Sequence, residues 1–310
     1  MTEFIITVNK TILMEFLLLG FSDIPDLKPF LFSMLLLVYM MTLAGNGAII
    51  MVTSLEKSLQ KPMYFFLCNL SILDICYTST TMPKMLQTLL TENNSISFNG
   101  CVTQMYLFVT FVGTECVLLS VMSFDRFVAI CRPLQYSGIM GPKFCINLAS
   151  ISWLCGFMNS LVHTVFTFRL NFCVSNRIND FYCDIPPLLS LACDDTTVNE
   201  LLLLSIGVFI GWTPFLCIIV SYIYIIITII KISSANGRKK SFSTCTSHLT
   251  VVILYYGSAI FNYVRPVSTY SLGKDRLISI LFSIVTPTLN PLIYTLKNKD
   301  VIKAMKKYVL

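Results

Sequence analysis

Seven long apolar stretches fill most of this chain of 310 residues. A helix needs about 20 residues to cross the hydrocarbon core of a membrane, and each stretch is long enough. Because backbone polar groups find no water in lipid, a chain with several such stretches folds as a helix bundle. The sequence therefore predicts an all-α membrane protein with a seven-transmembrane helix bundle, its spans lying at 29–55, 63–86, 101–130, 144–168, 201–230, 241–264 and 277–296.

Composition and charge agree with this fold class. Hydrophobic residues make up 55% of the chain and charged residues 12%, whereas soluble domains carry about 25% charged residues. Most of the Lys and Arg residues fall on the side of the C-terminus, and positively charged loops stay in the cytoplasm. We therefore expect a multi-pass plasma membrane protein with an extracellular N-terminus and a cytoplasmic C-terminus. The net charge of +6 follows from this topology and indicates no nucleic-acid partner.

No repeat or linker divides the chain, so we predict one seven-helix domain over 1–310. It comprises an extracellular N-terminal tail at 1–28, the helix bundle at 29–296 and a cytoplasmic tail at 297–310. Asn9 begins an Asn-Lys-Thr sequon in the outer tail and is a candidate for glycosylation. The segment 231–240 is predicted to be a short basic turn on the inner side.

The cytoplasmic tail has an amphipathic pattern. Val301, Ile302 and Met305 fall on one side of a helix, with Lys303 and Lys306 opposite. This pattern predicts a short helix lying on the inner leaflet. The alternative is a frayed basic tail, because short isolated helices are marginal in water.

Four of the 12 cysteines fall on the predicted outer side of the membrane. Cys101 lies at the head of the third span, and Cys173, Cys183 and Cys193 lie in the long loop after the fourth. Four cysteines allow three pairings, and the sequence alone does not choose among them.

The third span carries charged residues on one face. Helical geometry advances about 100° per residue, which places Phe108, Glu115 and Arg126 within about 20° of one another. Lipid would not tolerate the acid or the arginine, so this face must turn inward. The Asp125-Arg126 pair stands at its inner mouth and suggests a switch that signals across the membrane. The alternative is that Arg126 only extends to the interface, as Lys and Arg near helix ends often do.

Short motifs along the chain occur in a distinctive combination. They are Gly45-Asn46, PMYFFL at 62–67, NLSILD at 69–74, MSFDRFVAIC at 122–131, Ser221-Tyr222, KSFSTCTSHL at 240–249 and PTLNPLIY at 287–294. From about Phe16 to the C-terminus the chain resembles the class II (tetrapod-type) olfactory receptors, which are rhodopsin-like (class A) G-protein-coupled receptors. It departs from the usual family residues at Gln60, Phe124, Phe127, Gln135 and Lys297.

The resemblance implies an odorant receptor for small, mostly apolar volatile ligands. Such a receptor activates a stimulatory olfactory-type heterotrimeric G protein, raises cAMP and resides in the cilia of olfactory sensory neurons. It also implies disulfides Cys101–Cys183 and Cys173–Cys193. The implied G-protein switch consists of Asp125, Arg126, Tyr222, Asn290, Pro291 and Tyr294, in which Asp125 holds Arg126 at rest and activation frees it toward the tyrosines.

The ligand pocket is expected in the outer third of the bundle, between spans 3, 5, 6 and 7. An apolar lining with a few hydroxyls suits a neutral volatile. The outer half of span 3 has no Asp to pair with an amine, and span 7 has no Lys for a retinal Schiff base. Helical phase and family position nominate Phe108, Val109, Val112, Gly113, Ile206, Tyr256, Ile260, Tyr263 and Ile280.

Asp74 and Glu115 match the buried acid pair of the family, which could hold a structural sodium ion. The alternative is a pair of protonated acids that only form hydrogen bonds. No other cofactor is expected.

Three other function classes are alternatives to the odorant receptor. One is a non-olfactory class A receptor for another small ligand. A seven-span transporter would show matching halves with broken helices, and the chain shows no such duplication. An enzyme is disfavoured because His163 and His248 are the only histidines and neither lies near a set of metal ligands.

Overall fold

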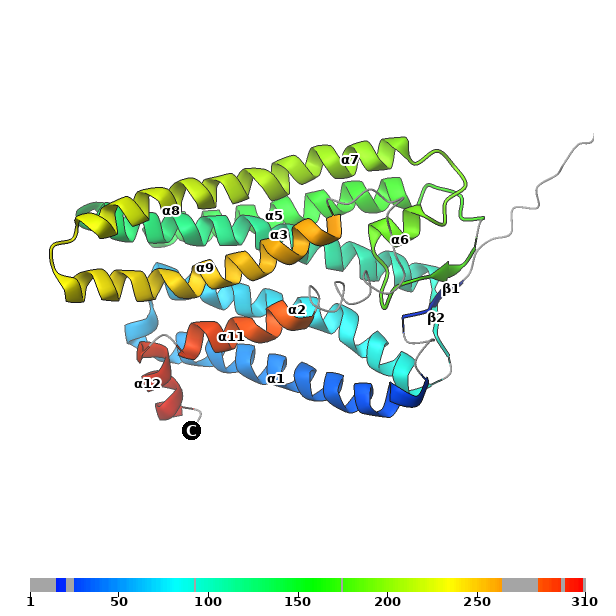
Figure 1. The fold of residues 1–310 in the computed structure, drawn as a ribbon, viewed down its shortest axis with the longest axis horizontal. Helices are drawn as coiled ribbons and strands as arrows, with labels where there is room; N and C mark the ends of the chain where they lie inside the picture. Colours follow the sequence, from blue (N-terminus) through cyan, green and yellow to red (C-terminus); the bar gives the residue numbers. More distant parts are fainter. Residues whose placement is uncertain are drawn as a thin grey trace, which may run out of the picture.

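The computed structural model describes residues 15–20, 25–91, 93–173, 175–263, 284–296 and 299–308. Long helices lie side by side and form an elongated bundle (Figure 1). The described helices of the bundle are α1 (Lys28–Leu55), α2 (Pro62–Leu90), α3 (Phe98–Cys131), α5 (Pro142–Thr167), α7 (Thr197–Gly207), α8 (Thr213–Lys231), α9 (Ala235–Tyr263) and α11 (Thr286–Leu296).

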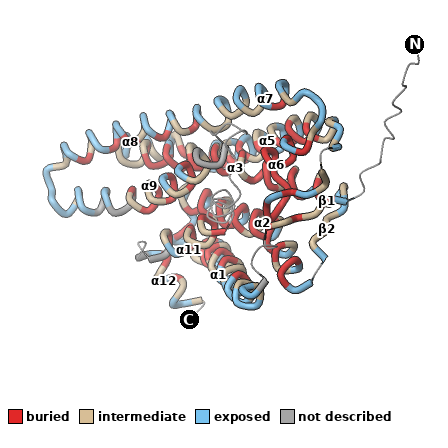
Figure 2. Tube along the Cα trace, turned by 45° about the vertical axis from the view of Figure 1, so that its right-hand side comes forward, coloured by how far each residue is buried: buried red, intermediate tan, exposed pale blue. Residues whose placement is uncertain are grey.

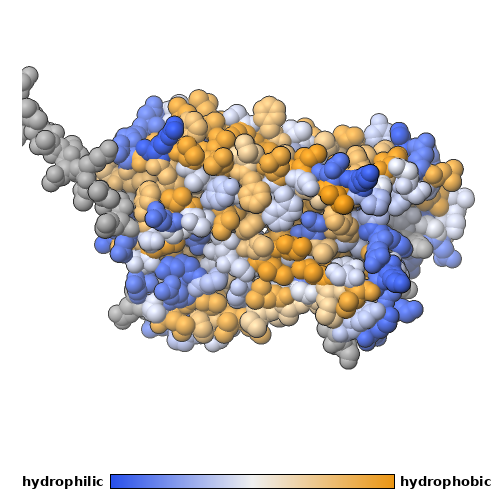
Figure 3. All heavy atoms as spheres, turned by 180° about the vertical axis from the view of Figure 1, so that it is seen from behind, coloured by the Kyte–Doolittle hydropathy of each residue, from blue (hydrophilic) through white to orange (hydrophobic). Residues whose placement is uncertain are grey.

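Within the described residues, four helical segments are long and apolar enough to cross a membrane: α1, α3, α5 and Thr197–Lys231. The last of these joins α7 to α8 through a π-helical turn at Val208–Trp212. The outer part of the predicted seventh span lies outside the described residues, and α11 covers its inner part. Figure 3 shows apolar side chains along the length of one face, with hydrophilic side chains gathered toward both ends.

Local sequence explains where several helices begin. Pro62 and Pro142 are the first residues of α2 and α5, the helical position at which proline loses no hydrogen bond. Ser97 precedes α3, and its Oγ accepts a 3.1 Å hydrogen bond from the Gly100 N–H. This side chain caps an otherwise unsatisfied backbone donor.

Helix α3 occupies the centre of the bundle. It packs against α2, α5, α8 and α9, and Figure 2 shows its buried residues surrounded by the other helices. Phe108, Glu115 and Arg126 are 0%, 2% and 8% exposed. The prediction that this face of the third span turns inward is confirmed.

A small three-stranded sheet covers the end of the bundle that the sequence predicts to be the outer one. Strand β1 (Glu15–Leu18) pairs antiparallel with β2 (Ser95–Ser97) and parallel with β3 (Arg177–Ile178). The sequence predicts no strand here and assigns residues 15–18 to the N-terminal tail, so that assignment is incomplete. Phe16 and Leu18 alternate with more exposed neighbours and are buried, the pattern of a strand with one packed face.

The inner end differs from the sequence prediction in one place. Helix α9 begins at Ala235, so only residues 232–234 connect α8 to α9. Segment 231–240, predicted as a basic turn, is therefore mostly helical. Its basic residues 238–240 form part of the first turns of α9.

The C-terminal amphipathic helix is present as α12 (Lys299–Tyr308). It packs across the inner ends of α1 and α11 and against the turn Lys57–Leu59 (Figure 1). Val301 and Ala304 are buried in this contact, and Lys307 Nζ lies 3.0 Å from Glu56 Oε2. The described tail is thus an ordered helix packed on the bundle, and the frayed alternative is not observed.

Candidate functional site

A largely apolar cavity of about 240 Å³ lies between α3, α5, α7, α8 and α9. Ile185, at the start of the short helix α6 (Ile185–Leu189), reaches it from the outer loop. The described residues that line it are Val109, Val112, Gly113, Cys116, Asn159, His163, Ile185, Leu203, Leu204, Gly207, Val208, Ile210, Gly211, Trp212, Phe215, Tyr256 and Ala259.

The nominated pocket residues divide into three groups. Val109, Val112, Gly113 and Tyr256 line this cavity. Phe108 and Ile206 are described but are not among the residues that line it. The remaining three are not placed: Ile260 and Tyr263 lie in α9 without described side chains, and Ile280 lies outside the described residues.

Packing and helical phase explain why Phe108 and Ile206 lie outside this lining. The Phe108 ring lies between those of Tyr77 and Tyr182, with ring centroids 5.1 and 4.6 Å away, so it belongs to the core. The stripe of cavity-lining residues on α7 and the following turn comprises residues 203, 204, 207, 208 and 210–212. Ile206 falls outside this stripe.

Helix α5 supplies cavity residues that the sequence prediction omitted. Asn159 and His163 are one helical turn apart and both line the cavity. Close approach of α3 and α5 brings them there: a Cβ added at Gly113 would lie 3.1 Å from Asn159 Nδ2 and 3.3 Å from Gly156 Cα. In the sequence, these two residues are a polar pair one helical turn apart in the fourth span. The expected pocket lay between spans 3, 5, 6 and 7 and so did not include them.

The long outer loop folds over the cavity. Cys101 is joined to Cys183, and Cys173 to Cys193, the same two pairs that the resemblance implies. The Cys183 N–H also donates a 3.0 Å hydrogen bond to Gln104 Oε1. The Cys101–Cys183 disulfide and this hydrogen bond hold the loop against the head of α3, near Ile185, which lines the cavity, whereas Cys173–Cys193 closes a subloop.

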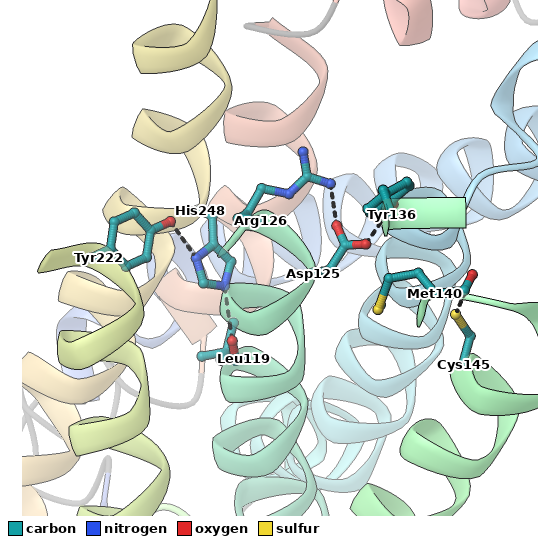
Figure 4. Close-up of polar contacts among 8 residues, drawn as sticks. All are labelled: Leu119, Asp125, Arg126, Tyr136, Met140, Cys145, Tyr222 and His248. Carbon is teal, nitrogen blue, oxygen red and sulfur yellow. Dashed lines mark hydrogen bonds and ion pairs between the residues drawn. The ribbon is translucent and has the colours of Figure 1, made fainter. Parts of the chain in front are cut away.

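At the inner end of α3, the Asp125 carboxylate has two partners. Arg126 Nη2 lies 2.6 Å from Oδ2, and the Tyr136 hydroxyl donates a 2.7 Å hydrogen bond to Oδ1 (Figure 4). Tyr136 begins the short loop helix α4 (Tyr136–Ile139). Burial and the hydrogen bond to Asp125 raise the pKa of Tyr136, so the phenol remains protonated and donates to the carboxylate.

A second polar chain connects α8 and α9 to α3. His248 Nε2 lies 3.1 Å from the Leu119 carbonyl, and His248 Nδ1 lies 2.8 Å from the Tyr222 hydroxyl (Figure 4). A carbonyl can only accept a hydrogen bond, so Nε2 carries a proton. The Tyr222 hydroxyl, which contacts Nδ1, also donates to the Cys245 carbonyl at 3.3 Å.

Buried oxygen atoms gather around Asp74. Asn290 Nδ2 donates to both Asp74 carboxylate oxygens at 3.1 Å. Glu115 Oε1, Asn290 Oδ1 and the Tyr294 hydroxyl have no hydrogen-bond partner among the described residues. Carboxylate and amide oxygens suit a hard cation, although the described chain contains no cluster of three or more His, Cys, Asp or Glu side chains that could hold a metal.

Comparison with known proteins identifies the family to which this chain belongs. The sequence profile of the family described as olfactory receptor matches residues 35–310. Mouse olfactory receptor 5AP2 is 50% identical over 96% of this chain and 94% of its own length. Human olfactory receptor 5I1 is 49% identical over 96% of this chain and 95% of its own length. This chain belongs to the olfactory receptor family and is a rhodopsin-like, seven-transmembrane receptor that is not an enzyme.

Proposed function

We propose that this odorant receptor binds a small, mostly apolar volatile ligand in the 240 Å³ cavity and activates a stimulatory olfactory-type G protein that raises cAMP. The observation that carries the proposal is the position of the cavity. It lies against α3, the same helix whose inner end carries the Asp125–Arg126 ion pair.

Size and lining define the ligand class. At about 30 Å³ per molecule of liquid water, 240 Å³ corresponds to the space of about eight water molecules. Among the described residues, the lining contains no Asp, Glu, Lys or Arg, so a charged ligand would lose its hydration without gaining an ion pair from them. Asn159, His163 and the Tyr256 hydroxyl offer hydrogen bonds to a neutral polar group of the odorant.

Hydrogen bonds between α9 and α3 provide a route from the cavity to the inner end. The Tyr255 hydroxyl donates to the Val112 carbonyl at 2.7 Å, and the Tyr256 hydroxyl donates to the Cys116 carbonyl at 3.3 Å. His248 donates to the Leu119 carbonyl one turn further in. An odorant that displaces Tyr256 would therefore alter a continuous set of contacts between the two helices.

Activation would release Arg126 from Asp125. Arg126, His248 and Tyr294 border one small void of about 10 Å³, so the guanidinium already lies beside one of the two tyrosines, Tyr294 and Tyr222, toward which it would turn. Pro291 lies inside α11, where it removes one backbone hydrogen bond and favours a hinge. In the active state the planar guanidinium would present donors to acceptors on the G protein.

The same proposal includes a sodium site, the membrane orientation of the receptor and a glycosylation site. Asp74, Glu115 and Asn290 would hold a sodium ion through their oxygen atoms when it is bound. The N-terminus would be extracellular, the C-terminus cytoplasmic, and the receptor would reside in the plasma membrane of sensory cilia. Asn9 lies outside the described residues and would carry a glycan.

A matched pair of variants tests the ligand site. Cells expressing the receptor with the olfactory G protein are exposed to neutral alcohols, aldehydes, ketones and esters, and cAMP is measured with surface expression. Val112→Phe fills the cavity, whereas Val165→Phe places the same ring on an exposed position of α5. We expect only Val112→Phe to reduce the potency of the odorant. Equal responses of both variants would contradict the proposed site.

A further inference from the structure

A groove of about 390 Å³ opens between α8 and α9 at the inner end of the bundle. In Figure 1 these two helices meet at the hairpin at one end of the molecule. The groove shares no lining residue with the odorant cavity or the Arg126 void. It is lined by Ile226, Ile229, Ile230, Ala235, Arg238, Lys239 and Phe242. We propose that it binds an anionic phospholipid of the cytoplasmic leaflet, an inference that rests on the proposed membrane orientation.

One part of the groove suits an acyl chain. Ile226 and Ile230 are one helical turn apart on α8, and Phe242 faces them from α9. Ile230 is 68% exposed and Phe242 63% exposed, so these side chains are available to a bound molecule. Their apolar surface lies at the membrane side of the first basic residues of α9.

The other part suits a phosphate group. Arg238 and Lys239 are exposed and form no ion pair with any residue that the structure describes. The sequence contains no Asp or Glu from 201 to 263, so neither helix supplies an acid to neutralise them. Ala235, the first residue of α9, also lines the groove, and a helix N-terminus adds a favourable field for an anion.

The layout of the groove favours a lipid over a free anion. The apolar run of α8 ends at Lys231, and basic residues begin α9 immediately before its uncharged stretch. The boundary between lipid and water therefore crosses the groove itself. A phospholipid presents the same succession of charged head group and apolar chain, whereas inorganic phosphate would use only the basic part. Phosphatidylcholine has no net charge to match the unpaired cations.

Native mass spectrometry of the purified full-length receptor in detergent provides the test. The probes are dioctanoyl phosphatidylserine, dioctanoyl phosphatidylcholine and inorganic phosphate. We expect phosphatidylserine to bind most tightly. Arg238→Gln/Lys239→Gln should weaken its binding roughly 30-fold, since each basic side chain at a membrane surface contributes about fivefold. The charge-conserving variant Arg238→Lys/Lys239→Arg should retain binding.

A control pair distinguishes the groove from general electrostatic attraction. Lys303→Gln/Lys306→Gln removes the same charge from exposed positions of α12 and should leave phosphatidylserine binding unchanged. Ile230→Ser/Phe242→Ser should weaken binding of the lipid. Equal losses from both glutamine pairs, or equal binding of phosphatidylserine and phosphatidylcholine, would overturn the proposal.

The G protein is the competing occupant of this surface. If Arg238→Gln/Lys239→Gln left lipid binding unchanged but abolished G-protein nucleotide exchange in phosphatidylcholine nanodiscs, the surface would belong to the protein partner and the lipid proposal would be wrong. The lipid measurement requires neither an odorant nor a G protein, so its outcome is separate from that of the proposed receptor function.

Discussion

The hydroxyl of Tyr136 donates a 2.7 Å hydrogen bond to Oδ1 of Asp125. The other carboxylate oxygen is 2.6 Å from Arg126, so the loop after α3 and the arginine share one acid. Hydrogen bonds to charged groups contribute about 1.5–3 kcal/mol. Tyr136 therefore orients the carboxylate that restrains Arg126.

Weakening this restraint should raise signalling without odorant. Asp125→Asn removes the negative charge, and we expect higher basal cAMP because Arg126 is released more readily. Tyr136→Phe removes one hydrogen bond and should raise basal cAMP less than Asp125→Asn does. The measurement is basal cAMP normalised to surface expression. Unchanged basal signalling in both variants would show that the Asp125 contacts do not hold the resting state.

Removing Arg126 should have the opposite effect. Arg126→Ala should abolish odorant-driven cAMP while leaving the cavity intact, because no cavity residue contacts the Arg126 void in the described chain. Arg126→Lys keeps the charge but loses the planar donor geometry, and we expect only partial recovery. A full cAMP response of Arg126→Ala at normal surface expression would assign this side chain a purely structural role.

Filling the cavity should reduce odorant potency. Overpacking a tight site typically costs about 1–3 kcal/mol, which corresponds to about 5- to 150-fold in affinity. Val112→Phe should shift the odorant dose–response curve by this amount. Gly113→Phe is a poorer probe because its side chain would press against Asn159 and Gly156 and separate α3 from α5. An unshifted curve for Val112→Phe would remove this residue from the ligand site.

The pairing of α12 with the bundle should depend on pH. The hydrogen bond with Lys307 lowers the pKa of Glu56, and hydrogen bonds with Tyr308 and Glu56 raise the pKa of Lys307. For Glu56 the stabilisation is present above its unfolded pKa and is lost as pH falls through the lower folded pKa. For Lys307 it is present below its unfolded pKa and is lost as pH rises through the raised folded pKa.

Hydrogen exchange of α12 measures this docking. At neutral pH both groups are charged, and Glu56→Gln should increase amide exchange in Lys299–Tyr308. Protection in the unmodified receptor should also fall at acidic pH, after correction for the intrinsic exchange rate. Gln60→Ala, at the exposed position that follows the same turn, serves as the control. Identical exchange in the receptor and Glu56→Gln would show that apolar packing alone holds α12.

The outer-loop disulfides can be mapped directly. Peptide mapping without reduction should recover Cys101 with Cys183 and Cys173 with Cys193. The second bond closes a loop with a sequence separation of 20 residues and contributes roughly 3 kcal/mol in the chain-entropy model. Cys173→Ser/Cys193→Ser should therefore lower the unfolding temperature. Recovery of Cys101 joined to Cys173 would contradict the assigned pairing.

The sequence by itself determined the helical class, the inward face of α3 and the amphipathic C-terminal helix. These features follow from local periodicity and from the cost of charge in lipid, which act within one helix. The strand that contains Phe16 shows what local patterns do not predict. This strand depends on pairing with segments near residues 95 and 177, and no local pattern specifies those partners.

Only the tertiary structure decided which side chains share a site. Helical phase brought Val112 and Phe108 to the same broad face, but aromatic packing removed Phe108 from the cavity. Asn159 and His163 entered the cavity because the glycines Gly113 and Gly156 let α3 and α5 approach closely. The spacing between helices depends on contacts between residues distant in sequence, so periodicity along one helix could not specify it.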